Sequence, residues 1–480
     1  MILNKEYYLG VFGIGETNLE ELVAQALKNG GDYADLYFED TFYSDILLRD
    51  SAVSAGGQHL DYGCGIRVLC GEKTGYAYSE STDIPSLTRA AAAAGVIADE
   101  AVCSEVAVSP ANRYFGKPNP KADRYPFTGD WRNEPLSTAV PFLESIESAI
   151  RAKENRCCKV IASLSTSVSD ILMYNSYGEL KYETRPLASL SITTIFQQEG
   201  KTVQNSVGRS LRTGTEFLTP QLATELAQEA VKGVDALFDA KRPKGGKMSV
   251  VMGAGASGIL LHEAMGHAFE ADFNRKGQSV FADRMGKSIC PKGINIIDDG
   301  TIPANRGACN FDDEGVPGQK TYMVEDGILA SYLHDRVSAR WYGVAPTGNG
   351  RRESFRYNPI PRMRATYMES GKDGSVQDLI AEAGNGIYVD SFSNGEVKIG
   401  EGDFTFYVKS GYLIENGRLT MPVKDINIVG NGPRALADIK GVAADLKIDD
   451  GTWTCGKEQS VAVSCGIPSV LIGKLTVGGE

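Results

Sequence analysis

The chain opens with a helical pattern of apolar residues that passes into β-like runs. A capping-box spacing, Thr17-x-x-Glu20, precedes apolar residues at the intervals of one helix face, namely Leu19, Leu22, Val23, Ala26 and Leu27. The helix should end at Gly30-Gly31. Runs typical of β-strands follow at 34–38, 46–48, 65–69 and 75–78, before an alanine-rich helix near 86–97. These elements predict an N-terminal α/β unit over 1–103.

A second unit is predicted over 137–240, after a linker at 104–136 that is rich in Pro, Asn, Lys and Asp. Apolar residues at helical spacing from Phe142 to Ile150 mark its first helix. Long alternating segments at 159–174 and 179–196 flank a turn at 176–178 and predict a hairpin. Thr219-Pro220 reads as an N-cap followed by proline at the first helical position, which predicts a helix running to about Phe238.

The remaining chain, 247–480, is predicted to be one β-rich domain that begins with a single helix. Turn pairs recur at 299–300, 326–327, 394–395, 416–417 and 450–451 and divide short β-like segments, as expected in an antiparallel barrel or sandwich. The predicted fold class is therefore α+β: two N-terminal units of helix and antiparallel sheet, then a mostly β C-terminal domain.

Composition narrows the possible functions. The net charge of -12 opposes a sequence-independent grip on nucleic acid, so we expect no nucleic-acid partner. The N-terminus lacks a signal-peptide pattern, and no apolar run reaches the roughly 18 residues of a membrane span, so we expect a cytoplasmic protein without membrane contact. Nine cysteines, an odd number in a long chain, argue against a disulfide framework.

The strongest chemical signal lies in the helix that opens the third unit, where His262 and His267 surround Glu263. Imidazoles suit zinc, and a carboxylate beside a ligand can act as general base on a metal-bound water, whose pKa falls to about 7. The interval is i+5, however, which on an ideal helix turns the second imidazole about 140° away. Convergence requires a π-bulge, a distortion or a helix end near Gly266. Two unrelated histidines are the competing interpretation.

The sequence resembles the TldD/PmbA metallopeptidases, and within them the TldD-like branch, over nearly its whole length. The motifs that carry the resemblance are His262-Glu263-x-x-x-His267 with Gly266 and Glu270, Ala34-Asp-Leu-Tyr-Phe-Glu, Gly63-Cys-Gly-Ile-Arg67-Val, Gly71-Glu-Lys-Thr-Gly-Tyr-Ala-Tyr78, Gly348-Asn-Gly-Arg-Arg-Glu-Ser354 and Pro361-Arg-Met-Arg. The resemblance implies a zinc-dependent peptidase with one Zn²⁺ per chain, although another divalent metal could occupy such a site. It also implies a peptide substrate and a dimer, either with itself or with a PmbA-like protein.

The resemblance further implies that a late cysteine is the third metal ligand, which corresponds to Cys455 in this sequence. Glu270 and Asp272 compete for that role, because a carboxylate downstream of paired histidines serves as a ligand in other zinc proteases. We prefer Cys455, with Glu270 orienting a histidine from behind. Glu263 is the expected general base. The rival from another class is a non-catalytic peptide-binding or regulatory subunit, in which the histidines are structural.

Three further features have both a functional and a structural interpretation. Arg351 and Arg352 could grip a substrate carboxylate, but structural ion pairing is the favoured interpretation. Tyr407 lies in an alternating segment, 404–413, that could be an edge strand pairing with an extended peptide, although a core strand is favoured. The polar segment from Asn274 to Ser288 could be a lid over the site or an ordinary loop.

Overall fold

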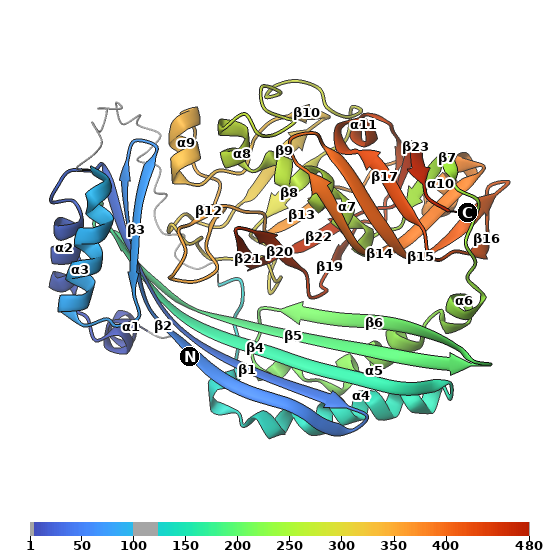
Figure 1. The fold of residues 1–480 in the computed structure, drawn as a ribbon, viewed down its shortest axis with the longest axis horizontal. Helices are drawn as coiled ribbons and strands as arrows, with labels where there is room; N and C mark the ends of the chain where they lie inside the picture. Colours follow the sequence, from blue (N-terminus) through green and yellow to red (C-terminus); the bar gives the residue numbers. More distant parts are fainter. Residues whose placement is uncertain (1–3, 99–122, 480) are drawn as a thin grey trace.

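The computed structural model describes residues 4–98 and 123–479 (Figure 1). A long antiparallel sheet runs along one side of the molecule, and the β-rich C-terminal half lies across from it. Most of the predicted linker, 104–122, lies outside the described residues. Within its described end, Trp131 is buried against the helices and strands of the second unit.

The long sheet has the strand order β3-β2-β1-β4-β5-β6, with every neighbouring pair antiparallel. Its strands are β1 (Tyr33–Arg49), β2 (Ala52–Cys70), β3 (Lys73–Ser79), β4 (Cys157–Asn175), β5 (Leu180–Gln198) and β6 (Lys201–Leu211). β1 pairs with β4 from Asp35↔Asn175 to Arg49↔Ile161, so the first two predicted units contribute to one sheet. The predicted division of the chain at 104–136 stays a prediction.

Two groups of helices cover this sheet at different ends (Figure 1). They are α1 (Lys5–Phe12), α2 (Glu16–Ala26) and α3 (Ile84–Gly95) at one end, and α4 (Val140–Lys153), α5 (Pro220–Val231) and α6 (Val234–Asp239) at the other. The N-cap of α2 is Gly15, so the predicted start at Thr17 is wrong by two residues. The helix predicted from Thr219 is interrupted at Gly233, whose φ of 75° is left-handed.

The C-terminal half contains a closed ring of five strands. They are β7 (Gly246–Met252), β14 (Gly386–Lys398), β15 (Asp403–Glu415), β17 (Asn427–Asn431) and β23 (Val470–Val477). They pair in the order β14-β7-β23-β17-β15, and β15 pairs with β14 again, which closes the barrel. β16 (Arg418–Pro422) and β18 (Ile439–Val442) extend it, and α10 (Val376–Ala383) and α11 (Gly432–Ala437) pack beside it.

A second C-terminal sheet has the order β10-β9-β8-β13-β22-β19. Its strands are β8 (Ile296–Asp299), β9 (Lys320–Glu325), β10 (Ile328–Leu329), β13 (Ala365–Met368), β19 (Lys447–Asp449) and β22 (Ser464–Ile467). Two small hairpins join β11 (Gly350–Arg351) to β12 (Ile360–Pro361) and β20 (Thr454–Lys457) to β21 (Gln459–Ala462). The predicted α+β class with a largely β C-terminal domain is confirmed.

The segment that follows β11 attaches the C-terminal half to the long sheet. Phe355 is fully buried against that sheet, where its backbone N–H donates to Glu39 at 2.8 Å and its carbonyl accepts from the Tyr76 hydroxyl at 2.6 Å. A Cβ on Gly63 would lie 2.3 Å from the Phe355 ring, so glycine is needed for this approach. Nearby, the buried Arg67 forms ion pairs with Asp35 and Glu314.

In the part of the chain that the structure describes, no helix combines the length and the apolar character that crossing a membrane requires.

Candidate metal centre

A π-helical turn brings the two histidines together. The chain leaves β7, passes through α7 (Ile259–Leu261) and then forms the π-helical turn His262–Gly266, before α8 (Ala271–Arg275). The N–H of His267 donates to the carbonyl of His262, the i→i+5 bond that defines such a turn. The i+5 spacing therefore places both imidazoles on one side of the helix, and of the three alternatives considered for their convergence the structure has the π-bulge.

Gly266 allows the π-helical turn to pack closely against the segment after β12. A Cβ at this position would lie 2.1 Å from the Met363 sulfur, and Met363 is itself completely buried. A side chain at position 266 would therefore force the helix and Met363 apart. Glycine at position 266 therefore permits both the close packing and the backbone geometry of the helix that carries the histidines.

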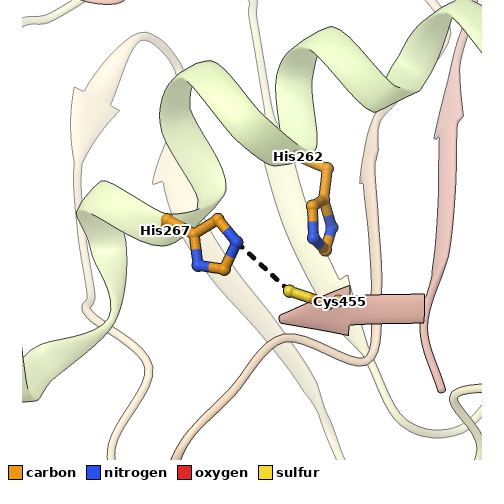
Figure 2. A group of neighbouring side chains, drawn as sticks. All are labelled: His262, His267 and Cys455. Atoms are coloured by element: carbon orange, nitrogen blue, oxygen red, sulfur yellow. Dashed lines mark hydrogen bonds between the residues drawn. The ribbon is translucent and has the colours of Figure 1, made fainter. Parts of the chain in front are cut away.

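Cys455 meets the histidines from the opposite side, from strand β20 (Figure 2). Its Sγ lies 3.1 Å from His267 Nε2, and one ligand atom from each of His262, His267 and Cys455 lies within 4.8 Å of the others. All three side chains are buried. Two imidazoles and a thiolate are a donor set that zinc accepts.

The electrostatics of this group suit a bound cation. Within residues 4–98 and 123–479, neither ring nitrogen of His262 has a hydrogen-bond partner, although the residue is fully buried and buried polar atoms are nearly always paired. Burial alone would raise the pKa of Cys455, but the imidazoles of His262 and His267 lower it to about 4. A thiolate is the form of cysteine that binds metals.

Glu263 lies beside the ligands without belonging to them. Its Oε2 is 3.8 Å from His267 Nε2, on the side of that ring which faces Cys455, and a quarter of its side chain is exposed. A carboxylate placed between the ligand atoms and solvent can exchange a proton with a reacting group there.

Glu270 and Asp272 lie behind the histidine. Glu270 Oε2 is 3.0 Å from His267 Nδ1 and accepts from Lys457 Nζ, also at 3.0 Å, while Asp272 pairs with the same Lys457 ammonium at 2.8 Å. Burial would raise the pKa of Glu270, but Lys457, His267 and Arg362 lower it to about 2. Among the described residues, the ligand atoms that gather are those of His262, His267 and Cys455, so neither carboxylate joins them.

The arginine pair that we considered for substrate binding is buried and engaged with the protein. Arg351 donates to the carbonyls of Met363 and Ala462, and Arg352 donates to the Asp313 carbonyl and the Tyr76 hydroxyl. Both side chains therefore hold neighbouring segments together, mainly through hydrogen bonds to carbonyls, and Arg352 also lies 3.7 Å from an Asp35 carboxylate oxygen. Their contact with substrate stays a prediction.

The edge-strand alternative for the segment around Tyr407 is wrong. β15 pairs with β14 on one side and with β17 and β16 on the other, so it offers no free edge to a peptide. The Tyr407 ring is half exposed, and its contact with substrate stays a prediction.

The segment from Asn274 to Ser288 has more anchors than its sequence indicates. Asn274 and Ser279 are buried and donate to the Ala268 carbonyl, and the buried Phe281 ring lies 4.8 Å from that of Phe269. These contacts join residues 274–281 to the helix that carries the histidines at three points, which restrains this part of the segment. Its role as a lid stays a prediction.

Two residues contact the site in a way that the sequence did not predict. Lys457 binds both acidic residues behind His267, and Arg362 donates to the Cys455 carbonyl at 2.7 Å. A signal for Lys457 exists, because residues i and i+2 of a strand share a face and Lys457 stands two positions after Cys455. Arg362 belongs to the Pro361-Arg-Met-Arg motif, but its sequence gives no hint that it contacts Cys455.

The sequence matches the models of a known protein family and several full-length relatives. Three family profiles match: PmbA/TldA metallopeptidase domain 1 over 34–98, the central domain over 129–237 and the C-terminal domain over 245–479. A Haemophilus influenzae protein named metalloprotease TldD homolog is 39% identical over 93% of both chains. A Saccharolobus solfataricus protein named zinc metalloprotease TldD homolog is 34% identical over 61% of this chain and 65% of its own.

Solved structures share the fold at lower identity. TldE from Thermococcus kodakarensis has a TM-score of 0.73 and 19% identity, and the match covers 96% of this chain and 100% of that one. A Thermotoga maritima protein described as a candidate modulator of a DNA gyrase has a TM-score of 0.76 at 23% identity, with 96% and 100% coverage. The profile matches and the full-length relatives agree with the motifs, and the chain belongs to the PmbA/TldD metallopeptidase family.

Proposed function

We propose that this protein is a zinc-dependent peptidase that hydrolyses peptide bonds in peptides or unfolded segments. The observation that carries the proposal is the meeting of His262, His267 and Cys455, whose ligand atoms come from distant parts of the chain and gather within 4.8 Å. The two unpaired, buried ring nitrogens of His262 support it, because such atoms need a partner.

The three residues would hold the metal, and Glu263 would perform the proton transfers. When bound, zinc supplies Lewis-acid polarisation of the scissile carbonyl and lowers the pKa of a water molecule. Glu263 then takes a proton from the attacking water on its carboxylate and returns it to the leaving amine. Its partial exposure supports this role, because a carboxylate that reaches solvent can contact a bound substrate.

Glu270 would orient His267 in this mechanism. Its Oε2 accepts a hydrogen bond from Nδ1, which leaves Nε2, 3.1 Å from Cys455, as the ring atom that would face a metal. Burial would lower the pKa of His267, but Glu270 and Cys455 raise it well above its usual value, so metal binding would have to release the proton on Nε2. Metal-binding histidines are commonly fixed in this way by a carboxylate.

Zinc content and hydrolysis of an unstructured peptide library, measured together, test the proposal. Wild type should carry about one zinc ion per chain and cleave peptides, and Cys455→Ser should lose both. Cys290→Ser is the matched control, since Cys290 is another buried cysteine outside the ligand group, and it should retain both.

A wild-type protein that binds no zinc after supplementation and cleaves no peptide would contradict the proposal. It would favour the non-catalytic peptide-binding subunit instead. Association as a homodimer or with a PmbA-like partner stays a prediction, as does the cytoplasmic location.

A further inference from the structure

The hairpin that carries Cys455 is weakly attached through its backbone. Among the described strands, β20 and β21 pair only with each other, whereas the strands before and after them in the chain, β19 and β22, belong to a six-stranded sheet. A two-stranded hairpin alone is marginally stable in water. The position of Cys455 must therefore be set largely by side-chain contacts between the hairpin and the rest of the domain.

Arg362 is one of these side chains. It is fully buried just after β12, and its guanidinium donates to the carbonyls of Cys455 and Gln459, each at 2.7 Å. These two carbonyls lie on the two strands of the hairpin. A planar guanidinium that binds both fixes their distance and orientation.

Lys457 makes the second connection, from the hairpin outward. It lies two positions after Cys455 on β20, and its ammonium donates to Glu270 Oε2 at 3.0 Å, Asp272 Oδ1 at 2.8 Å and the Pro361 carbonyl at 3.2 Å. Only 6% of the side chain is exposed. All three N–H donors of the ammonium are used, so its direction is fixed.

The Glu270 carboxylate accepts from both Lys457 and His267. One oxygen of Glu270 meets both His267 Nδ1 and Lys457 Nζ, and the other lies 3.8 Å from Arg362 Nε. A continuous set of polar contacts thus runs from the strand bearing one ligand to the ring that supplies another.

We propose that Lys457 is a positioning residue that, through Glu270, holds the His267 imidazole against Cys455, while Arg362 holds the hairpin itself. The inference rests on the metal site proposed above. Without the Lys457 ammonium, Glu270 would keep its hydrogen bond to His267 and the Arg362 guanidinium at 3.8 Å. The contact that links Glu270, and through it His267, to β20 would be lost. Residues that support metal ligands in this way contribute about 10- to 100-fold in metal affinity.

Cobalt binding tests the inference, because cobalt ligated by a thiolate shows a charge-transfer absorption that reports Cys455. Affinity is measured by competition with a chelator, in full-length protein. Lys457→Met should bind Co²⁺ about 10- to 100-fold more weakly than wild type, with a weaker thiolate band, and Lys457→Arg should recover most of the loss. Lys440→Met, at an exposed lysine on β18, is the control and should match wild type.

A double-variant cycle separates positioning from general damage to the fold. If Lys457 acts through Glu270, Lys457→Met should add little to the affinity loss caused by Glu270→Gln. Lys457→Gln, whose shorter amide cannot span the same acceptors, repeats the test should Lys457→Met fail to fold.

Equal affinity and an equal thiolate band in wild type and Lys457→Met would overturn the inference and leave the zinc site standing. Full additivity with Glu270→Gln would overturn it as well. A wild-type protein that binds no cobalt would instead refute the metal site itself.

Discussion

Glu263 differs from its two histidine neighbours in exposure. His262 and His267 are buried, whereas a quarter of the Glu263 side chain reaches solvent. Burial suits residues that bind an ion, and access suits a residue that must meet a changing series of substrates. The different environments support the different roles proposed above for the two histidines and Glu263.

Replacement of Glu263 by glutamine should therefore separate metal binding from catalysis. We expect kcat to fall about 10²- to 10⁴-fold, because the amide cannot accept the proton, while zinc content stays at the wild-type value. Peptide hydrolysis and mass spectrometry on the same preparation measure both. Glu382→Gln, at an exposed position on α10, should change neither, and normal activity in Glu263→Gln would exclude the role as base.

His334 predicts a dependence of stability on pH. Its ring is buried beside Tyr342, and burial lowers its pKa from 6.5 to about 4. Between pH 6.5 and pH 4 the unfolded chain binds a proton on this histidine and the folded chain does not. The contribution of His334 to the free energy of unfolding is therefore full above pH 6.5 and is lost as the pH falls to 4. The loss should approach about 3 kcal/mol.

The measurement is the melting temperature of wild type and His334→Phe between pH 4 and pH 7. The phenyl ring keeps the packing but does not titrate, so the variant should lose less stability on acidification. Parallel curves for the two proteins would show that His334 is not responsible.

The site residues differ in how far the sequence reveals them. His262, Glu263 and His267 stand within one short motif, and their types alone indicate metal chemistry. Cys455 is 188 positions from His267, and only the family resemblance connects them. Contacts that depend on tertiary folding, such as Arg362 with the Cys455 carbonyl, leave no local pattern to detect.

The π-helical turn is the element on which the site depends, and it has a cost that a regular helix avoids. Its i→i+5 geometry is rarer than α-helical geometry and is found mostly at functional sites. Here it is enclosed by tight packing, since Gly266 faces the Met363 sulfur with no room for a Cβ. Tight packing in the folded protein therefore stabilises a π-helical conformation that this segment would rarely adopt by itself.

Gly266→Ala should consequently destabilise the protein and weaken its metal site. We expect about 1–3 kcal/mol lower stability from the forced displacement of Met363, together with weaker zinc binding as His267 moves. Thermal melting and zinc titration measure these effects. Gly10→Ala in α1, where a Cβ meets nothing within 4 Å, is the control.

The same substitution combined with Met363→Ala gives the decisive comparison. If the clash is the cause, the smaller side chain should relieve part of the loss, so the two changes should be non-additive. A Gly266→Ala protein as stable as wild type would contradict the packing argument.

Elements with clear periodicity could be predicted, including the long hairpin of β4 and β5, whose segments 159–174 and 179–196 alternate regularly, but β1 and β6 could not. The runs at 34–38 and 46–48 belong to one strand, β1, because the polar Glu39 and Thr41 between them are buried and bonded to each other. β6 was missed, since it is an edge strand with few buried positions and is held mainly by its ladder with β5. In both cases pairing with a neighbour outweighs the local pattern.

The two halves of the protein are joined by buried polar contacts as well as by Phe355. Glu39 on β1 accepts from the Phe355 N–H and from Thr41, and burial raises its pKa from 4.5 to about 7. The folded state thus prefers the protonated acid. The stability due to this group is complete below pH 4.5 and is lost as the pH rises through 7.

Glu39→Gln should therefore make the protein more stable than wild type at pH 8, by about 3 kcal/mol, and bring the two proteins to within about 1 kcal/mol of each other at pH 5. The amide keeps an acceptor for the Phe355 N–H and never ionises. Melting temperatures across this range provide the measurement. A difference between the two proteins that does not vary with pH would contradict the assignment.

The separation of Cys455 from the histidines has a further meaning in polymer terms. An ion bound by both would close a loop of 188 residues. A crosslink that closes a loop of this length lowers the entropy of the unfolded chain, which raises its free energy by roughly 5 kcal/mol at room temperature. Most of the C-terminal half lies inside this loop, although β7, β22 and β23 lie outside it. Loss of the ion would therefore remove a topological restraint along with the reactive centre, and a chain stripped of metal should become both inactive and easier for other proteases to degrade.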